Sequence, residues 1–119
     1  MTPHFSKDEL ACKCCGHAPM SAEFMNILEK VRVQYGKPMP VSSGYRCPKH
    51  NQSVSNSGPN GPHTTGRAVD ILVSGGNAME LLRVILAHGS KWGLGIQQKG
   101  DVRARFIHID NIRKRMWSY

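Results

Sequence analysis

The sequence of 119 residues has no apolar run approaching the roughly 20 residues that a membrane-spanning helix needs. Residues 1–10 lack the apolar core of a secretory signal peptide, so we expect a soluble protein without an export signal. Acidic residues are also scarce. The chain has eight Asp and Glu but sixteen Lys and Arg, which gives a formal net charge of +8. This excess favours polyanionic partners such as nucleic acid, anionic lipid or an anionic cell wall.

No nucleic-acid-binding motif accompanies the positive charge. Six of the sixteen basic residues lie between Lys99 and Arg115, but the chain shows no RNA-recognition, helix-turn-helix or zinc-finger pattern. A solvated basic edge accounts for these residues equally well. Nucleic acid is therefore not the expected partner.

Cysteine is infrequent and unevenly placed. With three cysteines inside one tetrad, the chain lacks the spaced framework of a disulfide-rich mini-protein. The Cys-x-Cys-Cys run, followed by a glycine and a histidine, could supply part of a structural metal site, with the fourth cysteine as another ligand. Reduced buried thiols and a disulfide are the alternatives, and the sequence leaves all three open. The four residues are Cys12, Cys14, Cys15 and Cys47.

Length and composition indicate one globular domain over residues 1–119, with 39% hydrophobic and 20% charged residues. Ser21 is a good N-cap, and apolar residues at three- and four-residue steps predict a helix over residues 21–35 that ends at Gly36. A second helix is predicted to open with a capping box from Asn77 to Glu80.

Short strands are predicted at residues 39–43, 68–73, 94–97 and 105–109. The polar stretch between the first two, residues 44–63, is rich in Ser, Asn, Gly and Pro, and we expect it to lack regular structure. The order of elements predicts an α+β fold, with the helices packed on one face of a small, mostly antiparallel sheet.

Two predicted strands contain charged or titratable residues where apolar ones are expected. Asp70 interrupts an apolar strand, and burying its charge is costly unless the carboxylate is paired or binds a metal. His108 lies between two isoleucines, and Asp110 shares its face because side chains alternate along a strand. If the strands are neighbours, His63, Asp70 and His108 converge. Two imidazoles and one carboxylate leave a fourth tetrahedral position for water, as at a catalytic Zn²⁺; unrelated polar residues that cap turns are the alternative.

Four segments together resemble one family. "HTTGRAVD" resembles the His-x-x-Gly-x-Ala-x-Asp motif of the zinc D-Ala-D-Ala carboxypeptidases and peptidoglycan endopeptidases, whose fold is shared with the hedgehog signalling domain. "HFSKDELACKCCG" is similar to the start of the small, often phage-encoded branch of this family, "GKPMPVSSGYRCPKHN" to its substrate-loop segment and "FIHID" to its closing strand. The resemblance covers nearly the whole chain and implies a hedgehog/D,D-peptidase-like fold.

The resemblance also implies roles for individual residues. His63, Asp70 and His108 match the zinc ligands of the family, and Arg46 matches the arginine that pairs with a substrate carboxylate or steadies the oxyanion, as a guanidinium does well. Neighbouring residues of the same segment are expected to shape the substrate loop or contact substrate: Ser42, Tyr45, His50 and Asn51.

The chain departs from the family pattern at the general base. Better-known members carry Glu or Asp three residues before the last zinc histidine, where this chain has Arg105, which cannot accept a proton. Asp110 is the first candidate for the base and Asp101, in the preceding turn, is the second. Alternatively, Asp110 only orients a ligand histidine.

The sequence thus predicts a zinc-dependent peptidase that cleaves bacterial cell-wall peptides, as a D,D-carboxypeptidase or as an endopeptidase on the stem peptide. The resemblance suggests a monomeric, endolysin-like enzyme, phage-encoded and acting at the peptidoglycan. One rival is a non-catalytic zinc-binding module of hedgehog-like fold that serves in assembly or wall binding. The other is a nucleic-acid-binding protein that depends on the basic C-terminal segment.

Overall fold

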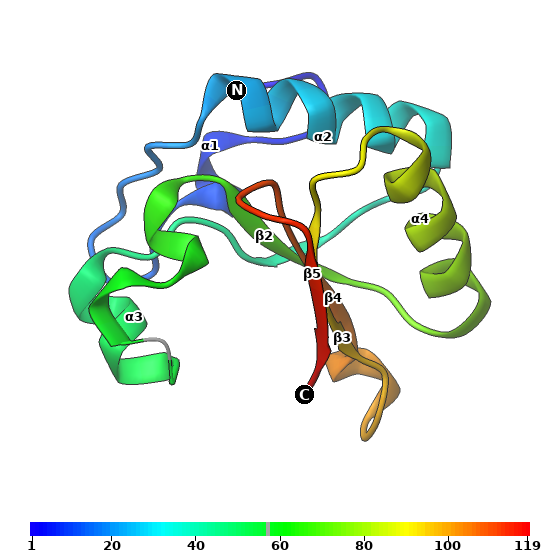
Figure 1. Cartoon of the computed structure of the whole chain (residues 1–119). Coiled ribbons are helices and arrows are strands. Elements are labelled where there is room, and N and C mark those ends of the chain that lie inside the picture. Colours follow the sequence, from blue (N-terminus) through cyan, green and yellow to red (C-terminus); the bar gives the residue numbers. More distant parts are fainter. Residues whose placement is uncertain (57) are drawn as a thin grey trace.

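The strands with unexpected polar residues lie side by side in the middle of a sheet (Figure 1). The computed structural model describes residues 1–56 and 58–119. In these residues the sheet has five strands in the order β1-β2-β4-β3-β5, and every pairing is antiparallel except that of β3 with β5. Their bounds are β1 Val41–Ser43, β2 Ala68–Leu72, β3 Gly93–Gln97, β4 Phe106–Asp110 and β5 Arg115–Ser118. The predicted mostly antiparallel sheet is confirmed.

The strand register separates an apolar face of the sheet from a polar one. Asp70 on β2 pairs directly with His108 on β4, which pairs in turn with Gly95 on β3. Because side chains alternate along a strand, the neighbours of these residues point to the opposite face. That opposite face consists of fully buried aliphatic side chains, among them Val69, Ile71, Ile107 and Ile109.

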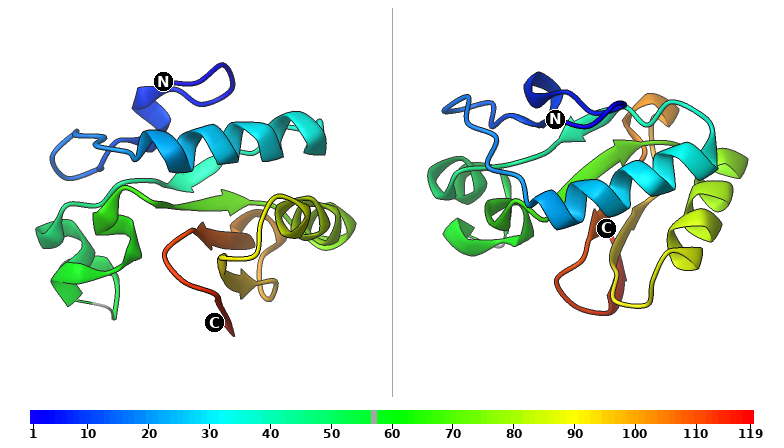
Figure 2. Two further views of the ribbon diagram at one scale, coloured as in Figure 1. Left: turned by 45° about the horizontal axis from the view of Figure 1, so that its top comes forward. Right: turned by 90° about the horizontal axis from the view of Figure 1, so that it is seen from above.

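Two helices cover the apolar face, as the sequence predicts (Figure 2). Helix α2, Ala22–Tyr35, begins after Ser21, whose hydroxyl accepts the N–H of Phe24, and ends at Gly36 in the left-handed conformation (φ 74°). Helix α4, Gly75–Ala87, packs beside it. Helix α2 contributes Phe24, Leu28 and Val31 to the core, and α4 contributes Leu81, Val84 and Ile85.

The predicted start of α4 is wrong. The helix begins at Gly75, with Ser74 as its N-cap residue, and no side chain caps it. Asn77 therefore lies inside the first turn, where its side chain accepts a hydrogen bond from Lys37 Nζ at 2.9 Å. The capping-box pattern misplaced the boundary because the two glycines before it join the helix.

The polar stretch 44–63 contains regular structure, so that expectation is also wrong. Helix α3, Pro48–Val54, begins after Cys47, whose sulfur accepts the N–H of His50. The 3-10 turns η1, Gly58–Asn60, and η2, Pro62–Thr65, follow; Ser57 of this stretch lies outside the described residues. Proline at the first helical position explains how such a polar stretch forms helical turns.

The short helix α1, Lys7–Leu10, the 3-10 turn η3, Val102–Ala104, and strand β5 complete the described elements. None of them was predicted from the sequence. None of the helices in residues 1–56 and 58–119 is both long and apolar enough to span a bilayer.

Candidate metal centre and its cavity

Three side chains converge on the polar face of the sheet. His63 comes from η2, Asp70 from the middle of β2 and His108 from the middle of β4. His63 Nε2 lies 3.2 Å from both Asp70 Oδ1 and His108 Nδ1, and His108 Nδ1 lies 3.0 Å from Asp70 Oδ1. All three residues are buried. The structure thus brings together the three residues predicted as metal ligands, and their role as ligands stays a prediction.

The ring orientation of His63 is fixed by the backbone. Its Nδ1 lies 2.7 Å from the carbonyl oxygen of Gly44, so Nδ1–H donates and the lone pair of Nε2 points to the point of convergence. The turn that carries the ring begins with Pro62 and ends at Gly66 in the left-handed conformation (φ 73°). A side chain at Gly66 would collide with the backbone of Pro19, so this position requires glycine.

Asp110 fixes the ring of His108 from behind. Asp110 Oδ2 lies 2.8 Å from His108 Nε2, the nitrogen that faces away from the other two side chains, while Oδ1 accepts the N–H of Ile112 at 3.1 Å. The Asp110 carboxylate is fully buried. It fits there because position 93 is glycine: a Cβ at Gly93 would overlap both carboxylate oxygens.

The electrostatics of the three converging groups favour a cation. Burial raises the pKa of the Asp70 carboxyl, but hydrogen bonds from His108 and His63 outweigh burial and hold that pKa well below its usual range. Those hydrogen bonds require a proton on a facing ring nitrogen. When both rings are neutral and their remote nitrogens donate to Gly44 and Asp110, the two facing nitrogens and Asp70 Oδ1 all carry lone pairs. Three lone pairs aimed at one point repel one another unless a proton or a metal ion lies between them. Two imidazole nitrogens and one carboxylate oxygen suit Zn²⁺ and leave its fourth position free.

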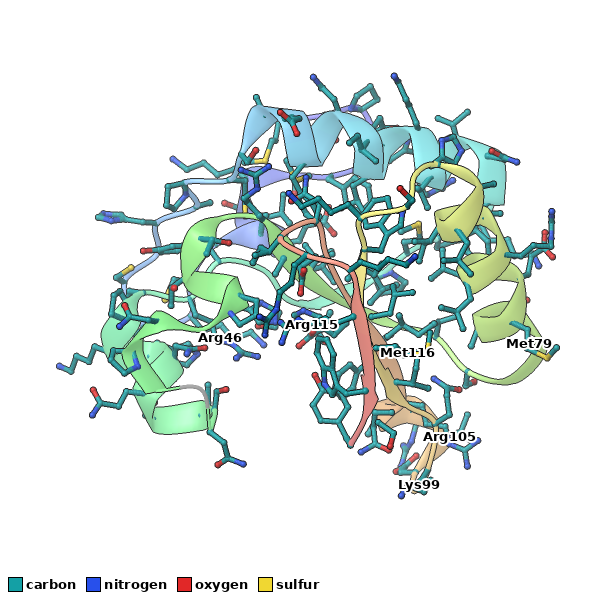
Figure 3. The ribbon with its side chains drawn as sticks, in the orientation of Figure 1. Arg46, Met79, Lys99, Arg105, Arg115 and Met116 are labelled. Carbon is teal, nitrogen blue, oxygen red and sulfur yellow. The ribbon has the colours of Figure 1, made fainter. Side chains whose placement is uncertain are left out.

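A cavity of about 460 Å³ opens over these groups. Two guanidinium groups line it, Arg46 and Arg115, and Figure 3 shows these two arginines close together, between the α3 segment and β5. An aromatic wall, which we define as Phe106, Trp117 and Tyr119, lines another part of the cavity. The cavity therefore combines a candidate metal centre with cationic and aromatic surfaces.

Arg46 is held in place by three side chains. Its Nε donates to Ser43 at 3.0 Å, one terminal nitrogen donates to Asn51 at 3.1 Å, and the other lies 3.5 Å from Asp70 Oδ2. Asp70 thus directs one oxygen at the two imidazoles and the other at Arg46. Asn51 is fully buried although it lies in the polar stretch. Its role in shaping the loop stays a prediction.

Arg115 and Trp117 are cavity residues that the sequence interpretation missed. The Arg115 guanidinium lies 4.4 Å from the centre of the Trp117 ring, and that ring lies 5.0 Å from the ring of His108. Gly95 makes room for this stacking, since a Cβ there would collide with the indole. The signal was a period of two in Arg115, Trp117 and Tyr119, which places these side chains on one face of a strand.

Other predicted site residues lie elsewhere. Asp101 caps η3, is half exposed and forms an ion pair with Arg103 at 3.0 Å. Arg105, at the usual position of the base, donates to the carbonyl of Gly100, and Figure 3 shows it with Lys99 at the tip of the molecule away from Arg46. Asp101 and Arg105 are not among the described residues that line the cavity. The same holds for three residues predicted to shape the substrate loop or contact substrate: Ser42, Tyr45 and His50. The roles predicted for Asp101, Ser42, Tyr45 and His50 stay predictions.

The fold and the three converging donors define an α+β protein with a candidate metal centre at the floor of a cavity. The family model described as Peptidase M15 matches residues 3–110, and the chain belongs to this family. The predicted resemblance to the zinc D-Ala-D-Ala carboxypeptidase-like family is thereby confirmed, whereas its phage-type branch stays a prediction. No curated protein matches the chain. Membership implies a metallopeptidase of a typically zinc-dependent family.

Proposed function

We propose that this protein is a zinc-dependent peptidase that cleaves peptide bonds of bacterial peptidoglycan, with His63, Asp70 and His108 as the zinc ligands. The observation that carries the proposal is the convergence of their three ligand atoms within 4.8 Å of one another, below a cavity. Bound Zn²⁺ would polarise the scissile carbonyl and lower the pKa of a bound water molecule towards about 7.

The side chains around the cavity suit a peptide with a free carboxylate. We assign to Arg46 the binding of that carboxylate or the stabilisation of the developing oxyanion. Its hydrogen bonds to Ser43 and Asn51 keep the planar guanidinium oriented. Arg115 adds a second positive charge to the same cavity. The net charge of +8 also favours an anionic cell wall rich in peptide carboxylates. Cleavage at a terminal D-Ala-D-Ala and cleavage inside the stem peptide both fit this arrangement.

We assign Asp110 the orienting role rather than that of the base. Its contact with the remote nitrogen of His108 keeps Nδ1 available for the metal, and its complete burial separates it from substrate. Asp101, the second candidate for the base, is engaged by Arg103.

One observation favours the alternative hypothesis of a non-catalytic zinc-binding module. Among the described residues that line the cavity, Asp70 is the only one with a carboxylate side chain, and it is already assigned to the metal. A peptidase without a separate carboxylate base has to draw on another proton acceptor, whereas a wall-binding module needs none.

Incubation of the zinc-loaded protein with purified peptidoglycan separates these functions. The peptidase releases new amino groups, either as free D-alanine or as peptides, and both His63→Ala and a chelator abolish the release. Zinc-dependent binding to peptidoglycan without release would instead establish the non-catalytic module. Salt-sensitive retention of DNA with neither wall binding nor release would contradict both.

A further inference from the structure

The four cysteines gather at one place outside the cavity. The sulfur atoms of Cys12, Cys15 and Cys47 lie within 4.8 Å of one another. Cys14 is not part of this group of three, but its side chain forms a hydrogen bond with Cys47. Four thiolates around a tetrahedral Zn²⁺, each with a Zn–S distance of about 2.3 Å, lie about 3.8 Å apart. The sulfur atoms of Cys12, Cys15 and Cys47 thus lie near the separations that a zinc-thiolate site requires.

The backbone around Cys12 forms a tight turn. Cys12 N–H donates to the carbonyl of His17 at 2.7 Å, and Gly16 N–H donates to the carbonyl of Cys12 at 2.8 Å. Gly16 adopts the left-handed conformation (φ 77°), which glycine reaches without strain. Inside this turn, Cys12 and Cys15 have the Cys-x₂-Cys spacing of structural zinc sites.

Backbone N–H groups point at the sulfur atoms of Cys12 and Cys47. The N–H of Cys47 donates to Cys12 Sγ at 3.3 Å. N–H groups directed at sulfur stabilise a thiolate, which is the form that binds metal. Cys47 Sγ accepts the N–H of His50 at 3.4 Å in the same manner.

From this geometry we propose a second, structural zinc site with Cys12, Cys15 and Cys47 as ligands and Cys14 as the fourth. Thiolates packed this closely repel one another unless a cation lies between them, and a d¹⁰ ion with four sulfur ligands is the arrangement that closed structural sites use. The proposal does not depend on peptidase activity, since none of these residues lines the cavity.

The site would connect the N-terminal segment to the segment that carries Arg46. Cys47 directly follows Arg46 and is the N-cap residue of α3, whereas Cys12 to Cys15 belong to the loop between α1 and α2. Lys13, in the same turn, donates Nζ to the carbonyl of Ser42 at 2.7 Å. Arg46 N–H donates to the carbonyl of His63 at 3.1 Å. Zinc bound to the cysteines therefore restrains the backbone from which Arg46 reaches the cavity.

Zinc stoichiometry after purification under reducing conditions, with removal of loosely bound metal, tests the proposal. We expect two Zn²⁺ per chain in the wild type and one in the double variant His63→Ala/His108→Ala. We expect one in Cys12→Ser/Cys15→Ser as well, with a lower melting temperature. Loss of all zinc from the histidine double variant, while its circular dichroism remains native, would overturn the second site. Loss of zinc only from the cysteine variant would leave the second site standing and refute the first, so the two failures are distinguishable.

Cobalt substitution provides a readout that tolerates unstable variants. Co²⁺ added to the histidine double variant should produce the near-ultraviolet thiolate-to-cobalt charge-transfer band. Cys14→Ser, introduced into that variant, should lower the band by about a quarter if sulfur ligands fall from four to three. An unchanged band would remove Cys14 from the ligand set, and a missing band in the histidine variant would refute the site. A disulfide among these cysteines, detected by the mass of the alkylated, unreduced protein, would refute it as well.

Discussion

The replacement Asp110→Asn separates an orienting carboxylate from a catalytic base. Both oxygens of Asp110 accept hydrogen bonds: Oδ2 from His108 Nε2 at 2.8 Å and, more weakly, from Arg115 at 3.5 Å, and Oδ1 from the N–H of Ile112 at 3.1 Å. An asparagine has only one oxygen, so its NH₂ group must face one of these donors. The amide either leaves the Ile112 N–H unpaired or forces the proton of His108 onto Nδ1, the atom assigned to the metal.

The magnitude follows from the burial of this carboxylate. An unsatisfied donor at a fully buried position costs about 1–3 kcal/mol of stability. Loss of an orienting carboxylate weakens zinc binding about 10- to 100-fold, which corresponds to about 1.4–2.7 kcal/mol. Competition with a chromophoric chelator measures this affinity, and thermal denaturation measures the stability. The half-exposed Asp101→Asn is the matched control and should leave zinc affinity unchanged.

An unchanged zinc affinity in Asp110→Asn would refute the orienting role. If turnover then falls roughly 10²-fold or more while zinc remains bound, Asp110 is the base after all.

Three further changes test the site and the fold. Gly93→Ala should cost about 1–3 kcal/mol of stability and weaken zinc binding, because its Cβ overlaps the orienting carboxylate. The control Gly76→Ala, with open space around it, should stabilise the protein by about 0.5–1 kcal/mol. Equal melting temperatures of the two variants would contradict this reasoning. Arg46→Ala should lower peptidoglycan turnover about 10²-fold with zinc content unchanged, and Arg46→Lys should restore little because a point charge cannot replace the planar group; full activity would remove the assigned role. Partial burial raises the pKa of Glu29, but hydrogen bonds from His4 outweigh it and lower that pKa. Glu29 thus stabilises the fold above its ordinary pKa of 4.5, so the stability lost in Glu29→Gln should vanish as the pH falls below that value, and a pH-independent difference in denaturation midpoint would exclude the ion pair as its cause.

The local signals that the sequence interpretation used were reliable where one physical effect dominated. Helix α2 has a side-chain cap at Ser21, an apolar stripe and a terminal glycine, and all three agree with the structure. Helix α3 was missed because its polar composition outweighed a proline and a cysteine cap at its start. Strand β5 was missed because its pairing with β3 joins two distant segments in parallel, and no local pattern specifies such a partner.

The amino-acid pattern was enough to single out the candidate site residues. Burying a carboxylate in an apolar strand, or a histidine between isoleucines, costs free energy unless the side chain has a polar partner. The hydrophobic pattern alone therefore singles out Asp70 and His108. The side-chain period of two also placed Asp110 on the face of His108, because that geometry is local.

The surroundings of those residues depend on the folded chain. The hydrogen bond of Asp110 to the remote nitrogen of His108, the ring of Trp117 beside it and the meeting of Cys47 with the N-terminal cysteines depend on contacts between distant segments. Such contacts follow from strand register and from the packing of whole elements, to which every residue of the chain contributes. Local periodicity could therefore identify the donors of the candidate site, but only the folded chain fixed where their lone pairs point.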